Sequence, residues 1–156
     1  MKTCHNIGIV RHPHNDRRRV LNIIILRLFL ATVCGAIVGL EREISDKAAG
    51  LRTHILVCIG SCMFGLLGLE LTANYPGADI LRLAQGLLVG VGFLGGGVIM
   101  REGASVKGLT TAAGIWVMGA IGLAIAFGRY YIALVGTLFI FLVIGLFGRV
   151  GKMVRK

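Results

Sequence analysis

Residues 109–147 read LTTAAGIWVMGAIGLAIAFGRYYIALVGTLFIFLVIGLF, and this stretch decides the fold class of the chain. It holds two apolar runs, 109–127 and 130–147, each close to the roughly 20 residues that a helix needs to cross a bilayer. Only Gly128 and Arg129 separate the runs. We therefore expect two membrane helices in a tight antiparallel hairpin, with the glycine ending the first of them.

Three further apolar stretches of similar length precede this pair, at 20–40, 51–73 and 79–100. Lipid offers the backbone no hydrogen-bond partners, so each span must pair its own amides. Spans of a β-barrel would alternate in polarity, and these do not. The sequence therefore predicts an all-α, polytopic membrane protein with five transmembrane helices in a glycine-rich bundle. This membrane domain is expected over 20–148, followed by a basic cytoplasmic tail at 149–156.

The composition leads to the same class. Of 156 residues, 56% are apolar and 15% are charged, and a soluble domain of this size cannot bury so much apolar surface. The 24 glycines and 2 prolines exclude collagen-like or disordered material and are typical of closely packed membrane helices. The net charge of +10 lies in loops and tails. We therefore expect membrane lipids, and no nucleic acid, as the partners of these bases.

Residues 1–19 do not fit the membrane domain. They are polar, lack the apolar core of a signal peptide and end in three arginines that resist export. We interpret them as a mis-assigned start or a disordered tail. Five spans place the two ends on opposite sides, and the distribution of Lys and Arg favours an outer amino end and a cytoplasmic carboxyl end.

The loops after the first and third spans resemble each other, because both read Arg-Glu and then Gly-Leu. This similarity predicts two hairpins in a parallel repeat, with both loops on one membrane face. The alternative is chance or shared hairpin chemistry. The residues concerned are Arg42, Glu43, Gly50, Arg52 and Thr53 in the first loop, and Arg101, Lys107, Gly108, Thr110 and Thr111 in the second.

Two interpretations of these loops remain open. In the first, the threonine hydroxyls cap the following helices, whose positive dipole ends bind an anion such as a lipid phosphate or a carboxylate. In the second, the acidic residues of the same face neutralise its bases in an ion-pair network. These acids are Glu41, Glu43, Asp46 and Glu102.

Three motifs of the chain resemble the MgtC/SapB family of bacterial inner-membrane proteins. They are Arg27-Leu28 with Gly35, Gly39 and Glu41-Arg42-Glu43; AGLRTH at 49–54 with Leu56-Val57; and Gln85, Gly90, Gly92-Phe93-Leu94-Gly95-Gly96-Gly97, Ile99 and KGLTTAA at 107–113. They occur in the family's order over roughly residues 27–127, which makes the match far more specific than a lone glycine motif. The resemblance implies a five-span domain of the bacterial inner membrane with a cytoplasmic carboxyl end.

The resemblance also implies a function. Members of the family act in adaptation to low magnesium, acid or host stress, as regulators of ion balance or membrane energetics. They contact other inner-membrane proteins, among them the proton-driven ATP synthase and ion transporters. A transporter or channel for magnesium or another cation is the alternative. Many members carry a cytosolic carboxyl-terminal domain, which we expect this chain, ending at Lys156, to lack. The sequence shows no catalytic motif and implies no cofactor, so we do not expect an enzyme.

Glycines four residues apart let membrane helices touch backbone to backbone. They form the pairs Gly35 and Gly39, Gly86 and Gly90, and Gly92 and Gly96. On the third span, Gly86, Gly90 and Gly97 share one face, and Gly92 and Gly96 share another, so we expect this helix to contact neighbours on two sides. Those neighbours are helices of the same chain or, alternatively, another protein or a second copy. The run Gly95-Gly96-Gly97 predicts a kink or break.

His54, Cys58 and Cys62 recur every four residues on one face of the second span. One interpretation is a soft-metal site for zinc or copper(I), and the other is a row of small, buried packing residues. Three ligands on one helix extend over about 12 Å, which is too long to surround one ion. We therefore favour packing and expect no metal site.

Two other polar residues, Arg27 and Gln85, are expected to be buried at membrane depth. Such residues are functional candidates, although Arg27 lies near a span end and alternatively extends to the interface. No Asp or Glu lies near the middle of a span, which gives little support to a magnesium path. We expect Glu70 to pair with Arg82 across the short link between the second and third spans.

Overall fold

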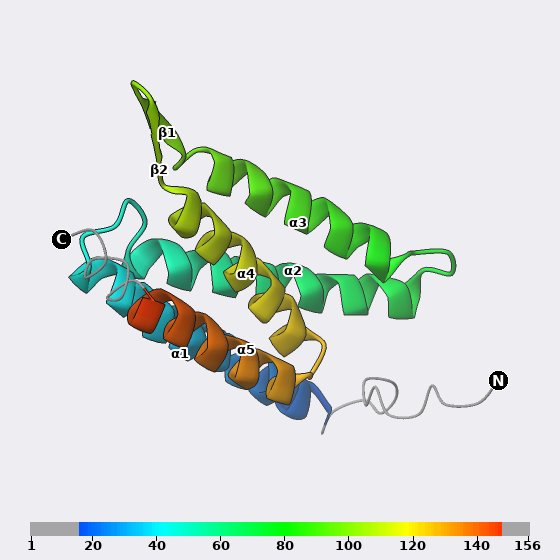
Figure 1. Ribbon diagram of the computed structural model, residues 1–156. Coiled ribbons are helices and arrows are strands. Elements are labelled where there is room, and N and C mark those ends of the chain that lie inside the picture. The colour runs from blue at the N-terminus through cyan, green and yellow to red at the C-terminus, as the bar shows by residue number, and fades with distance from the viewer. Residues whose placement is uncertain (1–15, 148–156) are drawn as a thin grey trace.

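The computed structural model of the chain describes residues 16–147. Five α-helices in this part run back and forth along a bundle (Figure 1). They are α1 (Asp16–Ile44), α2 (Leu51–Asn74), α3 (Ile80–Gly96), α4 (Leu109–Ala126) and α5 (Tyr130–Leu142), and a short π-helix (Val143–Phe147) continues α5. Three helices, α1, α2 and α4, are long and apolar enough to cross a membrane, and α3 and α5 are shorter apolar helices. The predicted all-α membrane fold is confirmed.

The first helix begins earlier than the expected span. It starts at Asp16 rather than Val20, so Arg17, Arg18 and Arg19 are helical and exposed. Of the segment 1–19, interpreted as a disordered tail or mis-assigned start, residues 1–15 lie outside the described part of the chain, as does the basic tail at 149–156.

The third helix ends earlier than the expected span. It stops at Gly96 in the triple-glycine run rather than at Met100, because glycine is the least favourable helix residue after proline. An exposed antiparallel hairpin follows, formed by β1 (Met100–Glu102) and β2 (Ser105–Lys107). From the sequence alone, Met100 is expected at the end of a span and the residues after it in a loop. The two strands correct this expectation, and the rest of the described fold is helical.

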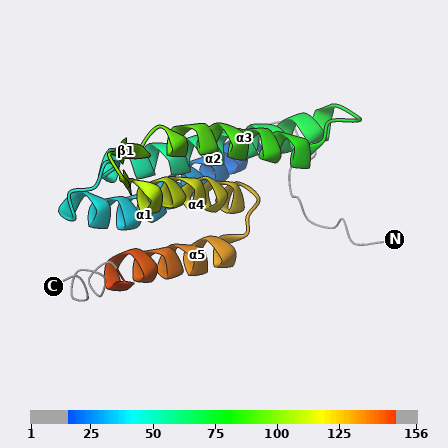
Figure 2. The same cartoon turned by 45° about the horizontal axis from the view of Figure 1, so that its top comes forward.

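The core of the bundle lies around α2 and α4. Helix α2 packs mainly against α1 and α4, while α3 and α5 lie on opposite sides of α4 (Figures 1 and 2). The largest fully buried side chains are Ile115, Met118 and Ile125, all on α4. Helix α4 is therefore the central helix of the bundle, and α3 is an outer helix.

The residues that end and cap the helices agree only in part with those expected from the sequence. Gly128 has a φ of 70° and ends α4, where the next amide, that of Arg129, donates to the carbonyl oxygen of Ala124 over 2.8 Å. The expected threonine caps are not formed, since the N-cap positions before α2 and α4 are held by Gly50 and Gly108, which provide no side-chain cap.

Candidate functional site

The two polar loops lie at the same end of the bundle (Figure 1). Glu41 forms an ion pair with Arg42, whose side chain is buried, and Glu102 forms one with Lys107 in the exposed β-hairpin. Burying a guanidinium is costly unless a carboxylate pairs with it. Glu41 therefore compensates the buried charge of Arg42.

Glu43 caps the second helix from eight residues upstream. Its Oε2 accepts a hydrogen bond from the backbone amide of Leu51 over 2.8 Å. A carboxylate of the chain therefore occupies the start of α2, and another engages Lys107. This arrangement favours the ion-pair interpretation of the loops over the anion site. The sequence offered no signal for this cap, because Glu43 lies outside the usual capping positions.

A buried polar row runs along the inner face of α2. The Nδ1 of His54 donates to the carbonyl oxygen of Gly50 over 2.8 Å, and the imidazole is fully buried. Glycines make room for the ring: a Cβ at Gly39 would lie 3.1 Å from the His54 Cβ, and one at Gly114 would lie 3.4 Å from Nε2. No spacing or motif in the sequence indicates this role for Gly114.

Two atoms of this row lack hydrogen-bond partners. Within residues 16–147, the His54 Nε2 and the Ser61 Oγ are the only buried side-chain polar atoms without one. Ser61 was not singled out from the sequence, although it follows His54 by seven residues and so shares its face of the helix.

The cysteines of α2 are packing residues in this structure. Cys58 and Cys62 are both fully buried. In the described part of the chain, no group of three or more His, Cys, Asp or Glu side chains is placed to hold a metal ion.

Arg27 links three helices near the other end of the bundle. Its Nη1 donates to the carbonyl oxygen of Ala126 at the end of α4 over 2.8 Å, and its Nε donates to the Tyr130 hydroxyl of α5 over 3.2 Å. The cation thus lies at the negative end of the α4 dipole. The sequence left open whether the Arg27 side chain is buried at membrane depth or extends to the interface. In the structure it forms hydrogen bonds within the bundle.

Within the described part of the chain, the interior contains no buried carboxylate. Among residues 16–147, the buried polar side chains are Arg42, His54, Ser61, Thr111 and Thr137. The expected ion pair between Glu70 and Arg82 is not formed: the ion pairs found in this part of the chain are those of Glu41 and Glu102. Nearby Asp79 instead caps α3 by accepting a hydrogen bond from the Leu81 amide.

The glycine pairs have opposite surroundings. In α1, a Cβ at Gly35 would lie 2.7 Å from the Ile55 Cα, and one at Gly39 would lie 2.8 Å from the Leu51 Cα. These glycines let α1 and α2 touch, as the spacing predicts.

The glycines of α3 are mostly open. A Cβ at Gly95 would lie 3.2 Å from the Ala112 oxygen of α4, whereas at Gly86, Gly90, Gly92 and Gly96 it would meet nothing within 4 Å. Both glycine faces of α3 expected to contact neighbours are therefore free within residues 16–147. The spacing in the sequence could not distinguish this open arrangement from the closed one of α1.

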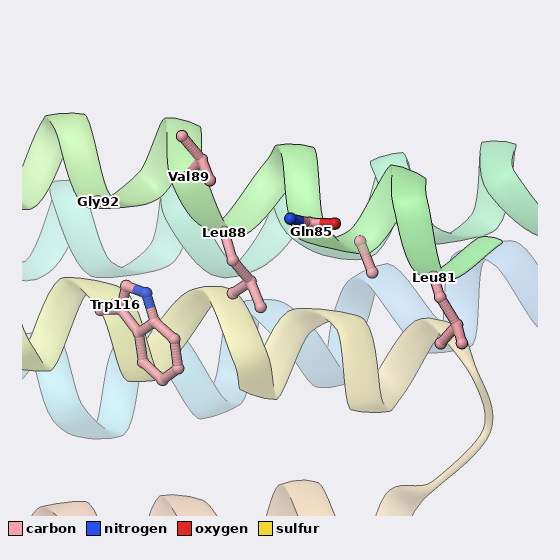
Figure 3. Close-up of a pocket in the computed structure, with 7 residues that line it drawn as sticks. Leu81, Gln85, Leu88, Val89, Gly92 and Trp116 are labelled. Carbon is pink, nitrogen blue, oxygen red and sulfur yellow. The ribbon is translucent and has the colours of Figure 1, made fainter. Parts of the chain in front are cut away.

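A groove runs beside one of these faces. It has a volume of about 590 Å³ and is lined by Leu81, Ala84, Gln85, Leu88, Val89 and Gly92 of α3 and by Trp116 of α4 (Figure 3). Gln85 is exposed here rather than buried, which corrects the expectation from the sequence. The helix turns this residue outward because Leu87, Val91 and Gly95 form its inner face.

Comparison with known proteins adds a second line of evidence. The model of the MgtC family matches residues 28–153. The "Putative magnesium transporter YhiD" of Escherichia coli K12 is 42% identical over 129 residues, which are 79% of this chain and 60% of that protein. Protein MgtC of Salmonella typhimurium LT2 is 40% identical over 80% of this chain and 52% of its own length.

Protein SapB of Bacillus subtilis is 41% identical over 75% of this chain and 53% of its own length. The chain thus spans between half and two thirds of the length of the relatives it matches. No solved structure matches it.

Proposed function

This chain belongs to the MgtC family, and on that premise we propose that it is a bacterial inner-membrane regulator of ion balance or membrane energetics. Its role is adaptation to low magnesium, acid or host stress. It acts by contact between its helices and another inner-membrane protein, such as the proton-driven ATP synthase or an ion transporter, and not by catalysis. Its carboxyl end lies in the cytoplasm.

The observation that carries this proposal is the open face of α3 formed by Gly86 and Gly90. Nothing lies within 4 Å of a Cβ at either position, and Phe93 on the same side of the helix is 83% exposed. Small residues four apart let a second helix approach closely in lipid, where van der Waals packing drives association. This face is thus a helix-sized contact surface that residues 16–147 leave uncovered.

The interior supports a contact role over an ion path. Magnesium demands oxygen ligands, usually carboxylates and water. Among the described residues, no Asp or Glu is buried, and the acids lie at helix ends and in loops.

The proposal is tested by replacing both glycines of the open face with leucine. Gly86→Leu with Gly90→Leu removes the close approach, and since a Cβ at either position meets nothing within 4 Å among residues 16–147, insertion and folding should persist. After cross-linking in native membranes, we expect the partner recovered with this variant to fall at least several-fold. Gly60→Leu is the matched control, because Gly60 is an open glycine on α2. Undiminished recovery with the double variant would contradict the proposal.

A transporter for magnesium or another cation is the second candidate, and the name of the Escherichia coli K12 relative favours it. The two candidates differ in a flux assay on pure protein in liposomes. Magnesium uptake that depends on Glu70 and Asp79, the acids of the α2–α3 end, would establish the transporter. Liposomes no more permeable than empty ones would favour the regulator.

A further inference from the structure

The groove between α3 and α4 contains polar groups that the chain leaves without partners. Gln85 lines the groove on α3 and Trp116 lines it on α4 (Figure 3). None of the hydrogen bonds formed by side chains within residues 16–147 involves the Gln85 amide or the Trp116 indole. Lipid supplies neither donors nor acceptors, so the polar groups of this groove need hydrogen-bond partners from another molecule.

Gln85 lies in the first half of α3, one of the two shorter apolar helices of the bundle. It follows the first residue of the helix, Ile80, by five positions, which is about 7–8 Å along the axis. The other residues of the groove wall are apolar or glycine. Apart from the Trp116 indole, the amide is therefore the one polar group in an otherwise apolar groove wall, and a polar group at the same depth would satisfy it.

We propose that this groove binds a second copy of the chain, so that two α3 helices pack side by side about a two-fold axis along the membrane normal.

The hydrogen-bonding groups of the Gln85 amide favour a second copy of the chain as the molecule that binds in the groove. Copies inserted with the same topology carry Gln85 at the same depth, and a two-fold axis brings the two amides together. A primary amide has both donors and an acceptor, so two of them can satisfy each other reciprocally. A lipid acyl chain brings no polar group, and an unrelated helix would have to place one at this depth.

The rest of the stripe suits a close approach of two helices. Gly92 and Gly96 follow Gln85 by 7 and 11 residues, which is two and three helical turns, so all three lie along one line of α3. A Cβ at either glycine would meet nothing within 4 Å. On the flanks, Leu81 is 73% exposed and Val89 is 70% exposed, and a second α3 would cover both.

This contact leaves the proposed partner surface free. Gly86 lies roughly a third of a turn around α3 from Gln85, and Gly90 lies further round on the same side. The dimer therefore does not depend on the proposed function, and either can fail without the other.

Cysteine cross-linking in liposomes tests the geometry. The full chain is prepared with Cys4→Ser and with either Val89→Cys in the groove or, as the matched control, Leu94→Cys on the opposite side of α3. Both positions are exposed, and the remaining native cysteines, Cys34, Cys58 and Cys62, are buried in both variants. Oxidation with copper phenanthroline should convert most of the Val89→Cys protein to a species of twice the mass, and several-fold less of the Leu94→Cys protein.

Replacing the amide tests the chemistry. Gln85→Leu should weaken dimerisation about tenfold, measured by energy transfer between labelled chains as the protein is diluted in lipid, because two hydrogen bonds between copies are lost. Gln85→Asn keeps the amide and should lose less. The proposal is overturned if Val89→Cys cross-links no better than Leu94→Cys, if Gln85→Leu dimerises like the parent chain, or if Val89→Cys is captured only by a different protein in native membranes.

Discussion

Gly35 of α1 and Ile55 of α2 lie in backbone contact, since a Cβ at Gly35 would lie 2.7 Å from the Ile55 Cα. On α3, Gly90 belongs to a glycine pair with the same spacing, and a Cβ there would meet nothing within 4 Å among the described residues. One residue pattern therefore has two uses. It closes the bundle between α1 and α2, and it leaves an open surface on α3.

This contrast predicts opposite effects of one substitution. Gly35→Ala should destabilise the protein by about 1–3 kcal/mol, because the new methyl group forces two backbones apart. Gly90→Ala should be neutral or stabilise by up to about 1 kcal/mol, because alanine favours helix and the space is free. Unfolding in detergent micelles measures both. Equal losses for the two variants would mean that the surroundings of α3 are not open.

A second prediction concerns Arg27. Arg27→Leu removes the bonds to the Ala126 carbonyl and the Tyr130 hydroxyl and should cost about 1–3 kcal/mol. Tyr130→Phe removes only the longer bond and should cost about 0.5–1.5 kcal/mol. The double variant should lose less than the sum, because one bond is shared. If the losses of the two single variants simply added up in the double variant, this would argue against the hydrogen bond between Arg27 and Tyr130.

The unpartnered hydroxyl of Ser61 gives a third prediction. Ser61→Ala should be neutral or stabilise the protein by about 1 kcal/mol, because a buried polar atom without a hydrogen bond is removed. Thr137→Val is the control, since the Thr137 hydroxyl donates to the Ala133 carbonyl over 2.7 Å and its loss should cost about 1 kcal/mol. Marked destabilisation by Ser61→Ala would reveal a partner for this hydroxyl.

The carboxylate cap of α2 gives a fourth prediction. Glu43→Ala should cost about 1 kcal/mol, because the Leu51 amide loses its acceptor. Glu43→Gln keeps a side-chain oxygen of the same reach and should cost clearly less. Amide hydrogen exchange at Leu51 reports on the bond directly, and equal exchange in the parent and Glu43→Ala would show that no cap is lost.

The helices and their order were predictable because lipid forces long apolar segments to pair their own backbones. Gly128 was predictable as a helix end because its left-handed backbone favours glycine. The β-hairpin was not, since strands of three residues carry almost no periodic signal. The family resemblance, too, was predictable from ordered motifs, and the comparisons confirm it.

The surroundings of individual residues were less predictable. Spacing shows that two backbones can touch, but not which helices do so, and so the closed face at Gly35 and the open one at Gly90 looked alike. Gln85 was expected to be buried, and only the position of α3 on the outside of the bundle shows that it is exposed. The Glu43 cap depends on the path of the α1–α2 loop, which local sequence does not determine.

A photo-activatable amino acid in place of Gly90 tests most directly whether the Gly86–Gly90 face contacts another membrane protein. The same amino acid in place of Gly60, an open glycine of α2, is the control. In magnesium-limited cells, we predict a discrete adduct from position 90 that contains a different inner-membrane protein and is absent from position 60. Recovery of only the unmodified chain from position 90, or the same adducts from both positions, would contradict it.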